Sequence, residues 1–396
     1  MPASPSTARA INDRLALRLL QQEGPLTAGR LKQLTGLSRP SVADLVERLT
    51  AAGLVTVVGE SGEQRRGPNA KVYGIVAGLA HLAALDVRTE GVSVVVADLL
   101  GEVLTEASVP IGDDTGTGPA VEQAVALVER AAKEAGVEQL YTVGIGAPGL
   151  IDPATGELRD STGLPQWHRT LVAALQERLP EARVIVENET NLAALAEQRD
   201  GAARDRDTFV LLWLGHGTGA AVVLDGTLRR GASGGTGEIG FLPVPGTAQL
   251  PSATDCEGGF HSLAGAVAIT ELADTHGLVA DADAHEPHAA ALVRTAVATP
   301  GTPAHARFLD TLADRVVIAA ASVVAVLDPG CVVLGGEIGR AGGDVLAARV
   351  EERLARMSPL PAEVRASTLG GGAVLRGALL MAREDAQEEL FGPSAR

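Results

Sequence analysis

Cysteine is scarce in this chain of 396 residues, which contains only Cys256 and Cys331. Two thiols so far apart in the sequence do not suggest a disulfide framework. The N-terminus also lacks the apolar core that a signal peptide would have. We therefore expect a protein of the reducing cytoplasm.

Long apolar runs are missing as well. The longest, from Val316 to Leu327, is shorter than the roughly 20 residues that a helix needs to cross a bilayer, and charged residues flank it. We interpret it as a buried helix and expect no contact with a membrane. Hydrophobic residues make up 46% of the chain, beside 47 Gly and 21 Pro, which indicates a compact α/β protein and excludes dominant disorder. The length predicts two or three domains.

Positive charge is in deficit, because 33 Lys+Arg face 49 Asp+Glu and give a formal net charge of −16. Averaged over the chain, this charge argues against a protein coated with nucleic acid. The balance is uneven, however, since residues 1–75 carry a net charge of +4 and the remainder carries −20. We therefore expect only the first segment to meet phosphate.

The basic segment has the pattern of a helix-turn-helix. A first helix carries apolar residues from Ile11 to Leu20. Thr27 is the expected N-cap of a second helix over residues 28–35, which Gly36 closes. After a short turn, Ser38 is the expected N-cap of a third helix whose apolar residues recur at helical spacing.

Two strands are expected next, over residues 54–58 and 70–76, and a β-hairpin placed there is a wing. The polar side chains of the third helix and of the wing tip are the expected contacts to double-stranded DNA. They are Ser38, Arg39, Ser41, Asp44, Arg48, Arg65 and Arg66. The alternative is a winged-helix protein-interaction module with a solvated polar face; the local basic charge favours DNA.

From Leu82 onward the sequence alternates β-branched strands with Ala-rich helices, in an order that occurs twice. A duplicated pattern of this kind predicts two similar α/β lobes with a cleft between them. The expected elements are strands at 82–87, 92–98 and 103–109, a helix at 119–135 and a strand at 141–147, then strands at 208–214, 220–224 and 227–230, several helices, a strand at 331–334 and a helix from Ala341.

Five short motifs identify a family resemblance. Gly144–Gly149, Leu164–Trp167, Glu187–Asn191, Gly237–Gly240 and Leu334–Gly336 occur in the order seen in the ROK family, and the resemblance covers essentially the whole chain. It implies an actin-like, RNase H-like duplicated fold of two lobes. A winged helix ahead of a ROK body resembles the family's transcriptional regulators more than its stand-alone sugar kinases. The resemblance therefore implies a repressor that forms a homodimer or homotetramer and whose sugar-binding body controls its affinity for an inverted-repeat operator.

The expected domains are a winged helix over residues 1–76, a first ROK lobe over 77–190 and a second over 191–396, with the C-terminal helix returning to the first lobe. The glycine-rich phosphate turn of ROK kinases corresponds to residues 86–90, where side chains have replaced both glycines. Glu189 stands where the kinases carry their catalytic Asp. We therefore expect no kinase activity and no cofactor, although the turn Gly215–Gly219 is better preserved.

The zinc site of the family is also degenerate. Phe241 stands at the position of its His ligand, and only Cys256 remains of its three cysteines. A tetrahedral zinc site cannot be assembled from these residues, so we expect no metal. His285 and His288 with Asp281 and Asp283 are more simply interpreted as a solvated acidic loop.

The resemblance assigns ligand contacts to one set of residues: Gly149, Trp167, Asn188, Glu189, Glu238 and His261. Asn188 can equally serve as a helix cap, and Trp167 can equally lie in the core. Gly163 replaces an Asn that the family uses for its sugar. With these changes the pocket is expected to suit a sugar or a sugar phosphate, and we advance an anionic sugar as a hypothesis.

Three interpretations stay open at this point. The first is a ligand-responsive regulator without enzymatic activity. The second is an active ATP-dependent sugar kinase with an accessory DNA-binding domain. The third is a regulator whose body only dimerises, which Phe241 and Gly163 favour.

Overall fold

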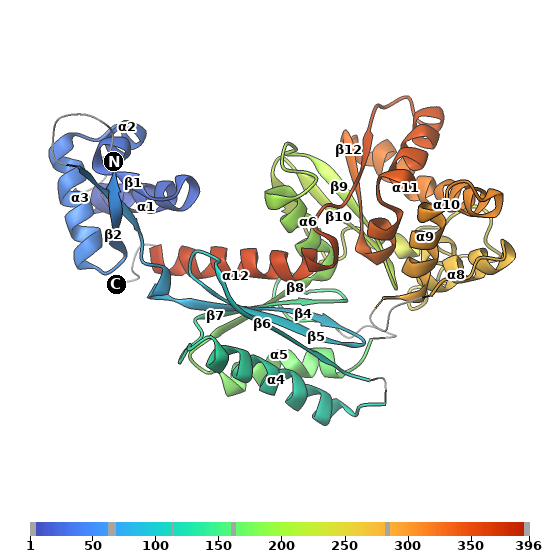
Figure 1. Ribbon diagram of the computed structural model, residues 1–396, viewed down its shortest axis with the longest axis horizontal. Coiled ribbons are helices and arrows are strands. Elements are labelled where there is room, and N and C mark those ends of the chain that lie inside the picture. Colours follow the sequence, from blue (N-terminus) through green and yellow to red (C-terminus); the bar gives the residue numbers. More distant parts are fainter. Residues whose placement is uncertain (1–4, 62–68, 113, 160–163, 282–285, 392–396) are drawn as a thin grey trace.

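The computed structural model describes residues 5–61, 69–112, 114–159, 164–281 and 286–391, and Figure 1 shows a winged helix followed by two α/β lobes. The predicted fold class is therefore confirmed. The winged helix consists of α1 (Pro5–Glu23), β1 (Leu26–Thr27), α2 (Ala28–Thr35), α3 (Arg39–Ala51), β2 (Val55–Ser61) and β3 (Ala70–Ile75), with its strands in the order β1-β3-β2.

Side-chain caps set the turn between α2 and α3, as the sequence predicts. Thr27 Oγ1 accepts a hydrogen bond from the amide of Arg30 at 3.2 Å, and Ser38 Oγ accepts one from the amide of Ser41 at 3.3 Å. Gly36 ends α2 with φ +70°, a conformation that glycine adopts without strain. The structure adds the short strand β1, which the sequence did not predict. The other differences are at the ends of elements: α1 already begins at Pro5, and β2 continues to Ser61.

The first lobe has a five-stranded sheet in the order β6-β5-β4-β7-β8. Helices α4 and α5 cover one face, and the last helix of the chain, α12, covers the other (Figure 1). Their bounds are β4 (His81–Arg88), β5 (Gly91–Asp98), β6 (Val103–Pro110), α4 (Thr117–Glu134), β7 (Thr142–Ala147), α5 (Trp167–Arg178), β8 (Arg183–Asn188) and α12 (Ala373–Phe391).

The second lobe repeats this topology, with a sheet in the order β11-β10-β9-β12-β13. In both lobes an antiparallel three-strand meander is extended by two parallel strands. The duplicated sequence pattern predicts the meander and the first of these parallel strands, but not β8 or β13. The bounds are α6 (Glu189–Asp200), β9 (Phe209–Leu214), β10 (Thr218–Leu224), β11 (Thr227–Arg229), α7 (His261–Ala264), α8 (Ala266–Thr275), α9 (His288–Ala298), α10 (Pro303–Leu327), β12 (Cys331–Gly335), α11 (Gly336–Met357) and β13 (Glu363–Ala366).

The apolar run near residue 320 lies in α10, where half of its side chains are buried in the core of the second lobe. Among the described helices, none is both long and apolar enough to span a membrane. Helix α11 begins at Gly336, five residues before the helix that the sequence predicts at Ala341.

Helix α12 connects the three parts of the molecule. It packs on β4 and β7 of the first lobe and on α6, which leads into the second lobe. At its far end, Arg14 of α1 donates from Nε to the carbonyl oxygen of Phe391 at 3.4 Å. One continuous hydrophobic cluster runs from the winged helix through α12 to β9 and β12. The winged helix is therefore packed against the body and not merely tethered to it.

Candidate functional site

Helix α3 presents a polar face to solvent, because Val42, Leu45, Val46 and Leu49 turn its other face into the core of the winged helix. Arg39 and Ser41 are exposed at the first turn of α3. Arg39 has no hydrogen-bond or ion-pair partner among the residues that the structure describes. Its guanidinium is therefore free to contact a base edge or a phosphate.

Arg48 is placed differently from the phosphate contact that the sequence suggests. Its guanidinium lies 2.6 Å from Asp13 Oδ1 on α1 and is also paired with Asp44, one turn earlier on α3. Arg48 thus joins α3 to α1 within the winged helix, and Asp44 is occupied by the same pair. Contact with DNA would require these two carboxylates to release it.

Ser38 is engaged as the N-cap of α3, and its hydroxyl lies 2.8 Å from that of Ser41. Arg65 and Arg66 of the wing tip lie outside the described residues, as does Gly163. The two wing strands that lead to this tip pair directly with each other, so the hairpin itself is formed.

Two of the expected ligand contacts, Gly149 and Asn188, meet beyond the carboxyl ends of β7 and β8. Asn188 donates from Nδ2 to the carbonyl oxygen of Gly149 at 2.9 Å, while its Oδ1 accepts from the amides of Thr190 and Asn191 at 2.9 and 3.3 Å. Asn188 is therefore the N-cap of α6, and it ties that cap to the loop after β7. One N–H of its amide stays available to a ligand.

At two glycines of the second lobe, Gly219 and Gly240, the backbone lies close to residues of this site. A Cβ built on Gly219 would lie 3.4 Å from Thr190 Oγ1, and one on Gly240 would lie 3.1 Å from the carbonyl oxygen of Thr218 and 3.8 Å from His261 Cβ. Glu238 is exposed two residues before Gly240. The hydroxyl of Thr218 is buried without a hydrogen-bond partner in the described structure, so a ligand hydroxyl could satisfy it.

Glu189 is the first residue of α6 and faces an acidic neighbourhood. No hydrogen bond engages its carboxylate within the described part of the chain. Burial, reinforced by the nearby Asp86, raises the pKa of Glu189 to about 8. A carboxyl group in this state can accept or donate a hydrogen bond to a sugar hydroxyl.

Arg88 fills the degenerate phosphate turn. Its Nε donates to Asp86 Oδ2 at 3.0 Å, and its Nη1 is ion-paired with Glu337 of α11 in the second lobe. A second ion pair, at 2.6 Å, joins Glu187 at the end of β8 to Arg230 after β11. The lobes are thus linked by salt bridges on two sides of α6.

Trp167 does not lie in the cleft, and its expected ligand contact is wrong. Only 4% of its surface is exposed, because it packs in the core of the first lobe. Its ring stacks edge-on against His168, with centroids 4.3 Å apart. Desolvation lowers the pKa of His168 to about 4, and the backbone of Arg88 opposes this shift only in part. This pair is structural.

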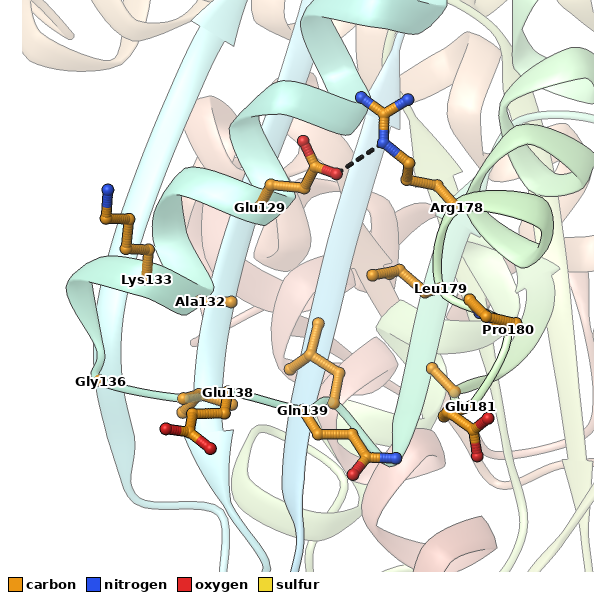
Figure 2. A pocket seen from close by; sticks show the side chains of 13 residues that line it. Glu129, Ala132, Lys133, Gly136, Glu138, Gln139, Arg178, Leu179, Pro180 and Glu181 are labelled. Atoms are coloured by element: carbon orange, nitrogen blue, oxygen red, sulfur yellow. Dashed lines mark hydrogen bonds and ion pairs between the residues drawn. The ribbon is translucent and has the colours of Figure 1, made fainter.

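A separate hollow lies at the other end of the first-lobe sheet (Figure 2). It has a volume of about 710 Å³ and is lined by the C-terminal turns of α4 and α5 and the segments that follow them. An ion pair of 2.7 Å between Arg178 and Glu129 crosses it. It opens before the amino ends of β7 and β8, whereas ligands of open α/β sheets bind beyond the carboxyl ends, where Asn188 lies.

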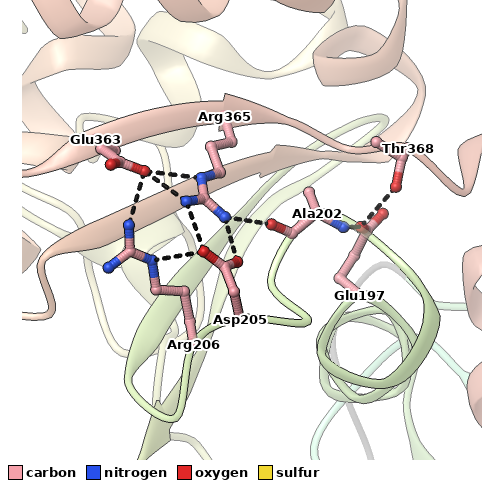
Figure 3. A network of polar contacts seen from close by, with 7 residues as sticks. All are labelled: Glu197, Ala202, Asp205, Arg206, Glu363, Arg365 and Thr368. Carbon is pink, nitrogen blue, oxygen red and sulfur yellow. Dashed lines mark hydrogen bonds and ion pairs between the residues drawn. The ribbon is translucent and has the colours of Figure 1, made fainter.

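A polar network fastens the C-terminal end of α6 (Figure 3). Glu197 is fully buried, and its carboxylate accepts hydrogen bonds from the amide of Ala202 at 2.6 Å and from the side chain of Ser367. Nearby, Arg365 lies 2.6 Å from Asp205 and 2.6 Å from Glu363. The network joins α6 to the loop that begins α12. Among the described residues, no group of three metal-ligating side chains is found.

Sequence patterns did not reveal Arg88–Glu337, Glu187–Arg230 or Glu197 as connecting residues. Each partnership joins residues far apart in the chain. Two features of the sequence could have pointed to the Arg88–Glu337 pair: a basic residue, Arg88, inside the degenerate phosphate turn, and an acidic residue, Glu337, directly after Gly335-Gly336.

Comparisons with known proteins agree with this geometry. The sequence profile of the ROK family matches residues 82–385, and that of the MarR family matches residues 11–67. The xylose repressor of Caldicellulosiruptor bescii is 24% identical over 60% of this chain and 59% of its own length. The DNA-binding transcriptional dual regulator NagC of Escherichia coli is 26% identical over 60% of this chain and 58% of its own length. The match thus spans under three fifths of these two relatives.

Kinases are similar too. A glucokinase of Halalkalibacterium halodurans is 30% identical over 63% of this chain and 79% of its own length. Among solved structures, a ROK family transcriptional regulator described as a homologue of the Escherichia coli MLC protein superposes with a TM-score of 0.77, at 21% identity over 97% of this chain and 98% of that one. A ROK hexokinase from Thermus thermophilus gives a TM-score of 0.61, at 28% identity over 78% of this chain and 99% of that one. Regulators and kinases thus share this fold.

Proposed function

The chain belongs to the ROK family, and from this premise we propose that it is a transcriptional repressor whose affinity for DNA is controlled by a sugar. One observation carries the proposal: a winged helix with a free arginine on its recognition helix shares a continuous core with a two-lobed ROK body. A stand-alone sugar kinase has no need of a winged helix. The two repressor relatives match only in part, so their activities enter here as support.

DNA contact is assigned to the N-terminal turn of α3, with Arg39 and Ser41 at base edges in the major groove. Arg65 and Arg66 are proposed to follow the backbone or the minor groove. Arg48 supports the orientation of α3 through Asp13 and reaches phosphate only by leaving it. The acidic body repels DNA, which confines contact to the winged helix.

The effector site is assigned to the cleft, with Gly149, Asn188, Glu189, Glu238 and His261 around it. Their free groups are hydroxyl acceptors and donors, which suits a polyhydroxylated ligand. The carboxylates near Glu189 argue against the anionic sugar of our initial hypothesis, because a phosphate would meet like charge. A thermal-shift series with D-glucose, D-xylose, N-acetyl-D-glucosamine and their phosphates tests this, since a ligand that binds the folded state raises the Tm.

The same residues support a protein without kinase activity. The side chain of Arg88 occupies the turn that would need bare amides around phosphates, and Glu189 carries one methylene more than the Asp it replaces. A displacement of the carboxylate by ~1 Å can lower a rate roughly 100-fold. No metal or cofactor is assigned to the chain.

Signal transmission is assigned to α6 and α12. The amino end of α6 carries Glu189 in the cleft, and its carboxyl end is held by Glu197 to the loop before α12. Helix α12 then runs to α1, where Arg14 binds the carbonyl of Phe391. A change in the angle between the lobes would move both helices and thereby the winged helix.

We further propose a homodimer, or a homotetramer of such dimers, that works in the cytoplasm and binds an inverted repeat. The proposed units are a winged helix over residues 1–76 and lobes over 77–190 and 191–396. Helix α12 packs on the first lobe although the second precedes it in the chain.

A footprint of the full-length protein on DNA upstream of its own coding region tests the proposed function. Protection of two half-sites about one helical turn apart is the expected result. Uniform, sequence-independent protection would contradict it.

A sugar kinase is the second candidate, favoured by the glucokinase relative and by the intact turn Gly215–Gly219. A coupled assay with ATP and a sugar panel separates the two. Turnover that disappears in Glu189→Ala would establish the kinase and remove the proposal of a non-enzymatic body. A regulator without any sugar control is the outcome in which DNA is bound but no sugar shifts the Tm.

A further inference from the structure

Arg88 and Glu337 meet across the cleft although they belong to different lobes. Arg88 ends β4 of the first lobe, and Glu337 is in the first turn of α11 in the second. The guanidinium is ion-paired with Glu337 and donates from Nε to Asp86 Oδ2 at 3.0 Å. The side chains are 27% and 18% exposed, so solvent screens their pair only partly.

The Glu337 carboxylate also lies against a glycine-rich turn of its own lobe. A Cβ built on Gly215 would lie 2.4 Å from Glu337 Oε2, so any side chain at Gly215 would collide with this carboxylate. Gly336, with φ +77°, allows the strand to turn sharply into α11 just before it. Glu337 therefore lies between the turn Gly215–Gly219 and the amino end of α11.

Within the turn, the amide of Gly215 donates to the carbonyl oxygen of Gly217 at 3.0 Å. The amino end of α11 nevertheless favours negative charge, because the positive end of the helix dipole lies there. In this chain a carboxylate of the protein itself supplies that charge. Asp86 and Glu90 add further negative charge on the opposite wall, whereas the raised pKa of Glu189, about 8, leaves that carboxyl mostly protonated at neutral pH. A nucleotide phosphate would have to displace Glu337 and would then face these carboxylates.

We propose that Glu337 is an internal substitute for a nucleotide phosphate, and that its ion pair with Arg88 latches the two lobes together without a nucleotide. In a nucleotide-binding cleft the ligand bridges the lobes; here two side chains do so. The latch goes beyond the proposed function and does not depend on DNA binding, so either can fail alone.

Hydrogen exchange of the full-length protein tests the latch directly. Arg88→Gln breaks it from the first lobe and Glu337→Gln from the second, so one variant suffices if the other fails to fold. In each we expect amide exchange at residues 215–219 and 336–342 to rise by roughly tenfold, because the two walls separate more often. The double variant should show no further increase, since both changes remove the same interaction.

Arg206→Gln is the matched control. It breaks an ion pair of 2.9 Å with Glu363 in the second lobe, away from the cleft, and should leave exchange at residues 215–219 unchanged. Unchanged exchange in both latch variants, or effects that add in the double variant, would overturn the proposal.

A nucleotide probe gives a second, independent readout. Millimolar Mg²⁺ with the non-hydrolysable ATP analogue AMPPNP should not protect residues 215–219 of the unmodified protein. Protection there would show that Glu337 yields its place to phosphate, and the assignment would be wrong.

Discussion

Gly377 of α12 lies so close to Leu192 of α6 that a Cβ at position 377 would be only 2.1 Å from the Leu192 carbonyl oxygen. Because the neighbour is backbone, it cannot swing away as a flexible side chain would. The two helices are therefore in contact along their backbones, between the cleft at one end and the winged helix at the other.

Gly377→Ala should lower the free energy of unfolding by about 1 to 3 kcal/mol, since an extra methyl must push α12 away from α6. Urea denaturation measures this change. Gly118→Ala is the control, because that helical glycine has open space around its Cβ position and alanine is favoured in helices. Equal stability of the two variants would mean that α12 and α6 separate freely.

Glu197→Ala should lower the free energy of unfolding by about 2 to 4 kcal/mol, since it leaves the half-buried amide of Ala202 and the Ser367 hydroxyl without their acceptor. Glu384→Ala is a surface control, because it removes an exposed ion pair of 2.6 Å with Arg199 that is worth about 0 to 1 kcal/mol. The comparison is made by thermal unfolding. If the Glu197 variant is as stable as the Glu384 variant, Glu197 does not hold α6 to the loop before α12, and the proposed link is wrong.

His168 should make the fold sensitive to mild acid. Its folded pKa of about 4 lies below the usual value of 6.5, so the unfolded chain takes up a proton first as the pH falls. The stability due to the neutral ring is complete above pH 6.5 and declines by about 3 kcal/mol towards pH 4.

His168→Phe should remove that part of the pH dependence and should cost little stability at pH 7.5, because phenylalanine is apolar and close in size to the buried imidazole ring. Urea midpoints at pH 5 and pH 7.5 measure both effects. The exposed His288→Gln serves as the control. If the Phe variant loses as much stability on acidification as the unmodified protein, the buried neutral ring is not responsible.

Arg39→Ala should weaken operator binding by about 1 to 3 kcal/mol and relax base preference at the half-site, because its free guanidinium is the proposed base contact. The double change Arg65→Ala with Arg66→Ala should instead weaken all DNA sites alike and flatten the salt dependence of binding. Titrations at several salt concentrations separate the two effects. An unchanged salt slope in the double variant would remove the wing from the interface.

Arg48→Ala should affect the stability of the protein and not only its binding to DNA, because Arg48 is paired with Asp13 and Asp44. It should lower the stability of the winged helix, because the half-buried Asp13 loses its cation. If the Arg48 variant loses DNA affinity while its Tm is unchanged, Arg48 contacts phosphate and does not mainly stabilise the winged helix.

The sequence was sufficient for features that depend on neighbouring residues. Thr27, Gly36 and Ser38 define the helix-turn-helix through local capping, and the duplicated strand pattern gives four of the five strands in each sheet. Trp167 could not be placed, because the same residue serves a pocket or a core and only the packing of α5 decides. Arg88 and Glu337 lie 249 residues apart, so no local pattern could pair them.

Reciprocal linkage between sugar and operator tests the central claim most directly. Fluorescence anisotropy gives the Kd of the footprinted operator with and without each sugar, and calorimetry gives the Kd of the sugar with and without the operator. We predict that at least one sugar changes operator affinity by roughly 5- to 150-fold, and that the operator changes the affinity of that sugar by the same factor. A sugar that binds the cleft while both factors equal one would contradict the account.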